Sequence, residues 1–195
     1  MKVIVFSSSP NDNGLTAACA AAAAAGVRMS GGQADEVRLT DAGINACVQC
    51  NNGWGACRTE HVCRPVGRDG QPSSEDGFES LHRAALQADA LILVTPVYWG
   101  DLSEAAKAFT DRLRRCEASR GDESGLRGKP VICVAAAGGS VGGMITCLLN
   151  MERWIQHVRA RTWDLIPVNR WSRPYKLIAI REAGRAMTAE AKPQG

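Results

Sequence analysis

The sequence predicts a doubly wound parallel α/β sheet with helices on both faces. Short runs rich in Val, Ile and Leu are each followed by a loop and then by a helical stretch, which is the rhythm of a parallel sheet. The central runs lack polar alternation, so both of their faces are expected to be buried. A chain of 195 residues, 45% of them hydrophobic, suffices for one such core, and we expect a single domain over residues 1–195.

Five strands and five helices are expected to alternate along the chain. The strands are predicted at residues 2–6, 34–38, 90–95, 130–135 and 162–168. The helices are predicted at residues 15–27, 75–87, 103–116, 142–159 and 173–191. The first helix is nearly all alanine, and small side chains allow a helix to lie close on its sheet. Residues 117–128 are polar and are expected to form a surface loop.

Charge and hydropathy exclude two classes of partner. The 23 basic and 20 acidic side chains leave a net charge of +3, too balanced for a nucleic-acid-binding surface. The longest apolar run, residues 84–97, is interrupted by Gln87 and Asp89 and falls short of the roughly 20 residues that cross a membrane. The apolar stretch at the amino terminus is too short for a signal peptide, so a cytoplasmic protein is expected.

Unusual sequences follow three of the predicted strands, at the ends where a doubly wound sheet binds its ligand. SSSPNDNGLT (residues 7–16) offers hydroxyls and helix-start N–H groups that suit a phosphate, although an N-capped turn would have the same sequence. TPVYWGDLS (residues 95–103) contains an aromatic pair that would cover a flat heteroaromatic ligand or anchor a helix on the sheet. AAAGGSVGGM (residues 135–144) has four glycines, which permit close approach of a ligand to the backbone.

These loops favour a mononucleotide that carries a ring system. The sequence has no Walker motif and no GxGxxG after the first strand, which argues against nucleoside triphosphates and the Rossmann dinucleotide mode. A phosphate loop, an aromatic loop and a glycine-rich loop at neighbouring strand ends match FMN bound where the strand order reverses.

The same segments carry a family resemblance. SSSPNDNGLT resembles the phosphate loop of the flavodoxin-like NAD(P)H-dependent FMN reductases, and TPVYWGDLSEAAKAFTDRLRR resembles their flavin-ring segment and the helix after it. Four cysteines between the second strand and the second helix resemble the iron–sulfur flavoprotein branch of that family. The resemblance extends from residue 1 to about residue 159 and implies a five-stranded parallel sheet in the order 2-1-3-4-5.

The resemblance also implies which residues bind FMN. The FMN phosphate would be held by Ser9, Asn11, Asn13, Gly14 and Thr16. The ribityl chain and isoalloxazine ring would be bordered by Pro96, Val97, Tyr98, Trp99 and Gly100, with Ala137, Gly138 and Gly139 near the pyrimidine side. Two departures weaken the phosphate site: Asn11 stands where the family often has a basic residue, and Leu15 where it often has Asn or Ser.

The eight cysteines divide into two groups. Cys19, Cys116, Cys133 and Cys147 are scattered through apolar or helical surroundings and are expected to be packing residues. Cys47, Cys50, Cys57 and Cys63 lie in one loop and could ligate a [4Fe–4S] cluster or, less readily, zinc; alternatively they are free or redox-active thiols. The six residues between Cys50 and Cys57 replace the two that are characteristic of the iron–sulfur flavoproteins, which leaves the metal open.

The predicted function is that of an NAD(P)H-dependent FMN reductase, an oxidoreductase that moves electrons from reduced pyridine nucleotide or a redox partner through FMN. No catalytic side chain is predicted, because hydride transfer requires only that the rings be positioned. The alternatives are a non-enzymatic electron-transfer flavoprotein or redox sensor, and a quinone, azo or nitro reductase of the same fold. The resemblance implies a homodimer or homotetramer, with a small-molecule electron donor and acceptor or a redox protein as partner.

Overall fold

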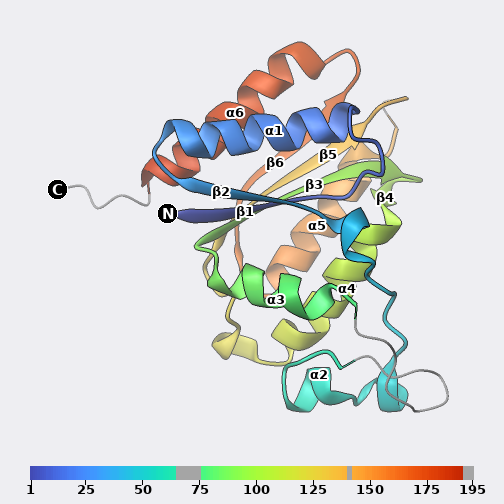
Figure 1. Cartoon of the computed structure of the whole chain (residues 1–195). Coiled ribbons are helices and arrows are strands. Elements are labelled where there is room, and N and C mark those ends of the chain that lie inside the picture. The colour runs from blue at the N-terminus through green and yellow to red at the C-terminus, as the bar shows by residue number, and fades with distance from the viewer. Residues whose placement is uncertain (65–75, 140–141, 191–195) are drawn as a thin grey trace.

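A parallel sheet runs through the middle of the molecule (Figure 1). The computed structural model describes residues 1–64, 76–139 and 142–190. The parallel strands are β1 (Lys2–Ser7), β2 (Gln33–Arg38), β3 (Ala90–Tyr98), β5 (Pro130–Ala137) and β6 (Arg161–Asn169). They lie in the order β2-β1-β3-β5-β6, which confirms the predicted order, and a sixth strand, β4 (Asp101–Leu102), pairs antiparallel with β3.

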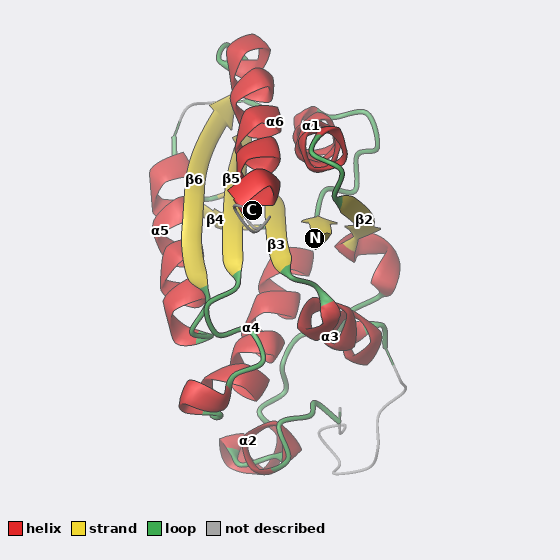
Figure 2. Cartoon of the chain, turned by 90° about the vertical axis from the view of Figure 1, so that its left-hand side faces the viewer, coloured by secondary structure: helices red, strands yellow, loops and turns green. Residues whose placement is uncertain are grey.

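Helices cover both faces of this sheet (Figure 1). On one face lie α1 (Leu15–Met29) and α6 (Arg173–Glu190), and on the other α3 (Phe78–Gln87), α4 (Glu104–Ala118) and α5 (Met144–His157). Figure 2 shows α2 (Ala56–Thr59) farther out, beyond α3 and α4 and away from the sheet. Within the described residues, no helix is both long enough and apolar enough to cross a membrane.

Side chains of successive strand residues pack alternately into two hydrophobic cores, one on each face of the sheet. In β1, Ile4 and Phe6 pack toward α3, α4 and α5, whereas Val3 and Val5 pack toward α1 and α6. All four are at most 2% exposed. Burial on both faces explains why the central strands are continuous apolar runs.

The alanine-rich helix α1 lies very close to α6. A Cβ added to Gly26 would stand 1.9 Å from the Arg181 carbonyl oxygen, and one added to Gly184 would stand 2.7 Å from the Ala23 carbonyl oxygen. The small residues therefore serve the contact between two helices as well as the contact of α1 with the sheet.

Element boundaries differ from the predictions where glycines intervene. The helix predicted from residue 142 begins at Met144, because Gly143 has a φ of +81°. The helix predicted from residue 75 begins at Phe78, after Gly77; residue 75, like the predicted last residue of the final helix, 191, lies outside the described residues.

The surface loop predicted at residues 117–128 is wrong in part. Glu117 lies within α4 and is fully buried, and Ser124 and Leu126 are buried as well. The Glu117 carboxylate accepts hydrogen bonds from His82 Nε2 at 2.8 Å, Ser124 Oγ at 3.0 Å and the Gly125 N–H at 2.8 Å. Burial opposes ionisation of Glu117, but these hydrogen bonds outweigh it and lower its pKa.

Candidate functional site

Loops after β1 and β3 are joined by hydrogen bonds at the carboxyl edge of the sheet. Ser103, the N-cap of α4, donates from Oγ to Ser8 Oγ at 2.8 Å and to the Ser8 carbonyl at 3.0 Å. Its N–H donates to Thr95 Oγ1 at 3.0 Å. All three residues are buried, so this network fixes how the two loops sit relative to each other.

The loop between β1 and α1 is shaped by its own side chains. The Asn11 N–H donates to Ser9 Oγ at 3.1 Å, and the Asn13 N–H donates to Asn11 Oδ1 at 3.0 Å. Gly14 is the N-cap of α1 and has no side chain with which to cap the helix. No side chain therefore caps the N–H groups of the first helical turn, which leaves them as donors for an anion.

Arg38 is a charged neighbour of this loop that the sequence analysis missed. It ends β2 in register with Ser7 at the end of β1, and it forms ion pairs with Asp12 and, at 3.5 Å, with Asp41. The guanidinium offsets the Asp12 carboxylate, which would otherwise repel an anion. The signal was present in the sequence, because neighbouring parallel strands end at the same edge of a sheet.

Trp99 and Gly100 form the two-residue turn of a hairpin between β3 and β4. Val97 pairs with Leu102 and Tyr98 with Asp101, and both turn residues have positive φ, +52° and +81°, as in a type I′ turn. Trp99 is fully exposed and Tyr98 is 43% exposed, whereas Pro96 behind them is buried. The hairpin therefore presents two aromatic side chains outward from the sheet edge.

The glycine-rich loop after β5 meets this hairpin backbone to backbone. A Cβ on Gly143 would lie 2.6 Å from Gly100 Cα and 2.9 Å from Gly100 N. Ala137 is buried, whereas Gly138 and Gly139 are exposed. All three predicted loops thus lie at one end of the sheet.

A cavity of about 630 Å³ lies beside the hairpin. It is lined by Val97, Tyr98, Trp99, Leu102, Glu104 and Lys107. The first three were predicted from the sequence as ring-binding residues, and the other three, from β4 and the first turns of α4, were not.

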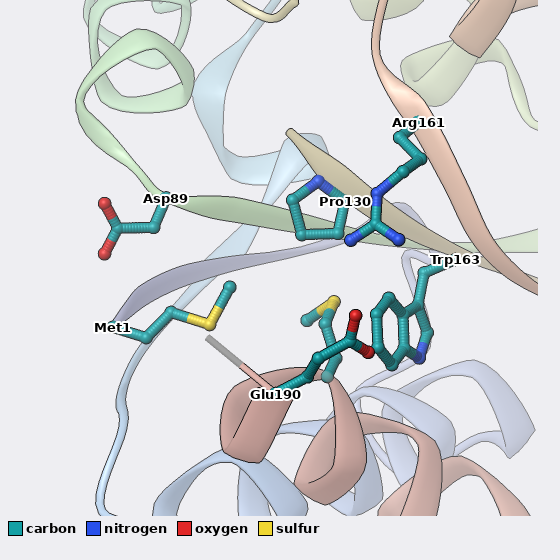
Figure 3. A pocket seen from close by; sticks show the side chains of 7 residues that line it. Met1, Asp89, Pro130, Arg161, Trp163 and Glu190 are labelled. Atoms are coloured by element: carbon teal, nitrogen blue, oxygen red, sulfur yellow. The ribbon is translucent and has the colours of Figure 1, made fainter. Parts of the chain in front are cut away.

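Another cavity, of about 440 Å³, lies at the amino ends of the strands, opposite the three loops (Figure 3). Figure 3 shows Met1 and Asp89 on one side of it and Arg161 and Trp163 on the other. Its lining contains none of the residues predicted from the sequence: Met1, Asp89, Pro130, Arg161, Trp163, Met187 and Glu190.

The segment with the four clustered cysteines has little regular structure. It contains a 3-10 helix (Cys50–Gly53) and the single turn of α2. Gln49, Asn51 and Asn52 have positive φ, a conformation that Asn tolerates better than most residues. The chain therefore turns sharply around Cys50, and all four cysteines are partly buried.

Two arginines of α4 support this segment. Arg112 donates from Nε to Cys63 Sγ at 3.2 Å and from Nη1 to the Asn45 carbonyl at 3.1 Å, and it forms an ion pair with Asp76 in which the side chains are 2% and 4% exposed. Arg115 donates from Nη2 to the Gly53 carbonyl at 2.5 Å. Neither arginine was predicted from the sequence.

The thiols and the two arginines influence one another electrostatically. A hydrogen bond with Cys57 raises the pKa of Arg115, and burial of the guanidinium offsets part of that rise. Burial raises the pKa of the Cys63 thiol, and Arg112 offsets part of that rise. Of the four predicted metal-binding cysteines, Cys63 contacts Arg112 directly, and Cys47 lines a cavity together with Arg115.

The cysteine segment has the chemistry of a metal site, although its side chains are not arranged as one. Across the described parts of the chain, no three His, Cys, Asp or Glu side chains are placed to hold a metal ion. The donor set nevertheless suits an anionic thiolate-ligated group, because Arg112 Nη2 and Arg115 Nε are buried without an acceptor among the described residues.

The four scattered cysteines are fully buried, which confirms that they are packing residues: Cys19, Cys116, Cys133 and Cys147. Burial raises the pKa of each thiol, to about 12 for Cys19 and Cys147.

A family model described as NADPH-dependent FMN reductase matches residues 1–163. An iron–sulfur flavoprotein from Methanocaldococcus jannaschii is 30% identical over 114 residues, which are 58% of this chain and 52% of that protein. An iron–sulfur flavoprotein from Archaeoglobus fulgidus is 27% identical over 113 residues, 58% of this chain and 46% of that protein. The chain spans about half the length of the curated relatives it matches.

Solved structures show the same fold. A flavone reductase aligns with a TM-score of 0.69 and 15% identity over 99% of this chain and 64% of that one. NAD(P)H:quinone oxidoreductase from Methanothermobacter marburgensis gives 0.66 and 17% over 96% of each chain. A flavodoxin, WrbA-like protein from Agrobacterium tumefaciens gives 0.59 and 16% over 97% and 96%. These likenesses confirm the flavodoxin-like architecture.

Proposed function

Because the chain belongs to the NADPH-dependent FMN reductase family, which its first 163 residues match, we propose that it passes electrons from reduced pyridine nucleotide through FMN to an acceptor. Membership of this family supports the predicted class, an FMN-binding oxidoreductase. The observation that carries the proposal is the junction of the three loops, in which Ser103 contacts Ser8 and Gly143 contacts Gly100. We take residues 1–195 as one FMN-binding domain.

The proposed phosphate site is the loop before α1. Its first-turn N–H groups would bind the FMN phosphate, together with polar groups of Ser9, Asn11, Asn13, Gly14 and Thr16. Arg38, paired with Asp12, offsets the negative charge of that carboxylate beside the loop. This supports a site that depends on backbone amides rather than on a basic side chain.

The proposed ring site is the hairpin and the glycine-rich loop. The isoalloxazine would lie against Pro96, Val97, Tyr98, Trp99 and Gly100, with Ala137, Gly138 and Gly139 along its pyrimidine side. When bound, FMN supplies the conversion between two-electron and one-electron chemistry. The chain's own residues orient the ring and exclude water from it, and the roughly 630 Å³ beside the hairpin leaves room for a second ring.

We further propose that Cys47, Cys50, Cys57 and Cys63 ligate an iron–sulfur cluster. The proposal is supported by the chemistry of the segment: four thiols lie near two guanidinium groups, and each guanidinium has one nitrogen without a hydrogen-bond acceptor among the described residues. Binding would require the segment to draw its sulfurs closer together. A cavity of about 380 Å³ lined by Cys47 shares Glu104 and Lys107 with the cavity at the hairpin, so cluster and flavin would be neighbours.

We also propose that the chain forms a homodimer or homotetramer. The support is an exposed apolar stripe at helical spacing along α6 and its start, formed by Trp171, Tyr175 and Ile178, which are 60%, 62% and 54% exposed. Light scattering at several concentrations tests this, and a monomer throughout would contradict it.

An anaerobic preparation tests the function. We expect a yellow protein with about four iron and four sulfide per chain that oxidises NADPH or NADH when loaded with FMN. Protein that stays colourless with added FMN would contradict the main proposal. Zinc, or no metal, would reassign the cysteines, and FMN binding without turnover of either nucleotide would favour an electron carrier.

A further inference from the structure

Arg112 and Arg115 both reach the cysteine segment from α4, but they differ in how their charge is balanced. Arg112 forms a buried ion pair with Asp76, and that carboxylate also accepts hydrogen bonds from the N–H groups of Asn45 and Phe78. Arg115 has no carboxylate partner within the described residues, and its Nη2 donates to a carbonyl of the segment instead. Arg115 therefore brings a positive charge to the segment that no neighbouring carboxylate offsets in the described parts of the chain.

The position of Arg115 relates it to several of the clustered thiols. Its Nη2 donates at 2.5 Å to the carbonyl of Gly53, which lies between Cys50 and Cys57 in the chain. The short helix α2, which carries Cys57, packs against α4 (Figure 2). Cys47 and Arg115 line the same cavity of about 380 Å³. The charge of Arg115 thus lies at the contact between α4 and the turn that holds these thiols.

Arg112 has a different task, because its contacts are those of a positioning residue. It donates from Nε to Cys63 Sγ at 3.2 Å and from Nη1 to the Asn45 carbonyl at 3.1 Å. The Asp76 carboxylate offsets its charge at the same time. Arg112 therefore orients one thiol and contributes little net charge.

A positive charge beside the thiols affects electron transfer more than it affects binding. Four thiolates give an iron–sulfur cluster a net negative charge, and one-electron reduction makes the cluster more negative still. A fixed positive charge nearby stabilises the reduced form more than the oxidised form. The Nε of Arg115 is buried, so solvent screens its guanidinium only in part.

We propose that Arg115 sets the reduction potential of the iron–sulfur cluster proposed for the four clustered cysteines, and that it does so through its charge. The inference rests on that proposed cluster and goes beyond it, because it assigns to one side chain a control of the direction of electron flow. A higher potential favours the passage of single electrons from reduced FMN to the cluster over the reverse.

The reduction potential is measured on the full chain, prepared anaerobically, by a redox titration followed with electron paramagnetic resonance. Arg115→Gln should lower the equilibrium constant for one-electron reduction of the cluster at least about tenfold, which is about 59 mV. Arg115→Lys, which keeps the charge, should recover most of that loss. Arg83→Gln is the matched control and should change nothing, because Arg83 is an exposed helical arginine on α3 paired with Glu79.

Two results would overturn the inference alone: Arg115→Gln with about four iron per chain and an unchanged potential, or Arg115→Lys with a potential as low as that of Arg115→Gln. If Arg115→Gln loses its iron, Arg115→His provides the comparison within one protein. Its potential should be higher at about pH 5, where histidine is charged, than at about pH 8, and equal values would overturn the inference.

The metal content of the unaltered protein separates this inference from the proposals on which it rests. Zinc, or no metal, overturns the proposed cluster and the inference together. FMN binding and NADPH oxidation are measured independently of the cluster, so the proposed reductase function stands or fails on those assays.

Discussion

Two regions meet α4, and they are held in place in different ways. At the amino end of the helix, the three loops are held by the buried hydrogen bonds of Ser103 and by the close approach of Gly143 to Gly100. Toward its carboxyl end, the cysteine segment depends on two arginine side chains, of which Arg112 is buried. The first region therefore depends on close contacts between loops at the sheet edge, whereas the second depends on long side chains that reach it from one helix.

The largest expected effect is that of Arg112→Met. It leaves the Asp76 carboxylate buried without its partner, which should cost about 3–5 kcal/mol in the free energy of unfolding. Denaturant titration measures this, and faster thiol labelling of Cys63 should accompany it. Arg112→Met/Asp76→Leu should recover much of the loss. If Arg112→Met costs no more than the exposed control Arg83→Met, the buried pair does not support the segment.

Gly143→Ala should break the junction at the sheet edge. The new Cβ meets Gly100, and the φ of +81° is unfavourable for alanine, so we expect a loss of about 2–4 kcal/mol and weaker FMN binding. Gly128→Ala is the matched control, because Gly128 has a φ of +72° with nothing within 4 Å of its Cβ position. Equal losses for the two variants would mean that backbone strain alone matters and that the loops do not need their close contact.

Trp99→Asn should separate FMN binding from stability. Asparagine tolerates the left-handed turn and Trp99 is fully exposed, so unfolding should change by less than about 0.5 kcal/mol. FMN affinity, measured by fluorescence titration, should fall about tenfold with the loss of stacking. Trp54→Asn in the cysteine segment should leave FMN affinity unchanged; a comparable loss there would show that the two regions share the flavin.

The smallest expected effect is a loss of stability at acidic pH that depends on Glu117. The pKa of Glu117 is lowered in the folded protein, so the stability it contributes is present above its ordinary pKa of 4.5 and is lost as pH falls below that value. Unfolding free energies measured from pH 6 to pH 3 should decline less steeply in Glu117→Gln. Parallel declines in the two proteins would remove Glu117 as a source of acid sensitivity.

The sheet was predictable because its signals are local. Runs such as ALILVT are buried on both faces, and a parallel sheet brings their carboxyl ends to one edge, so the three loops could be assigned to a common site. The hairpin turn was missed, because Trp99 occupies a left-handed position that usually selects Asn or Gly.

The arginines were missed for a different reason. A charged residue is usually expected on the surface. Arg112 is instead buried in an ion pair with Asp76, which is distant in sequence. Helical spacing did hold the signal, because Arg112 shares a face with the buried Phe109 and Cys116. The contacts of Arg112 with Cys63 and of Arg115 with the Gly53 carbonyl depend on tertiary structure that no local pattern contains.

The pairing of Gly26 with α6 and of Gly184 with α1 bears on where a working fragment of this chain can end. The family pattern stops at residue 163, before α6 begins, yet α6 covers the helix whose first turn faces the proposed phosphate site. A fragment trimmed to the matched residues would keep every predicted FMN contact and uncover Cys19, Ala23 and Val27. The boundary of the sequence family is therefore not the boundary of the folding unit.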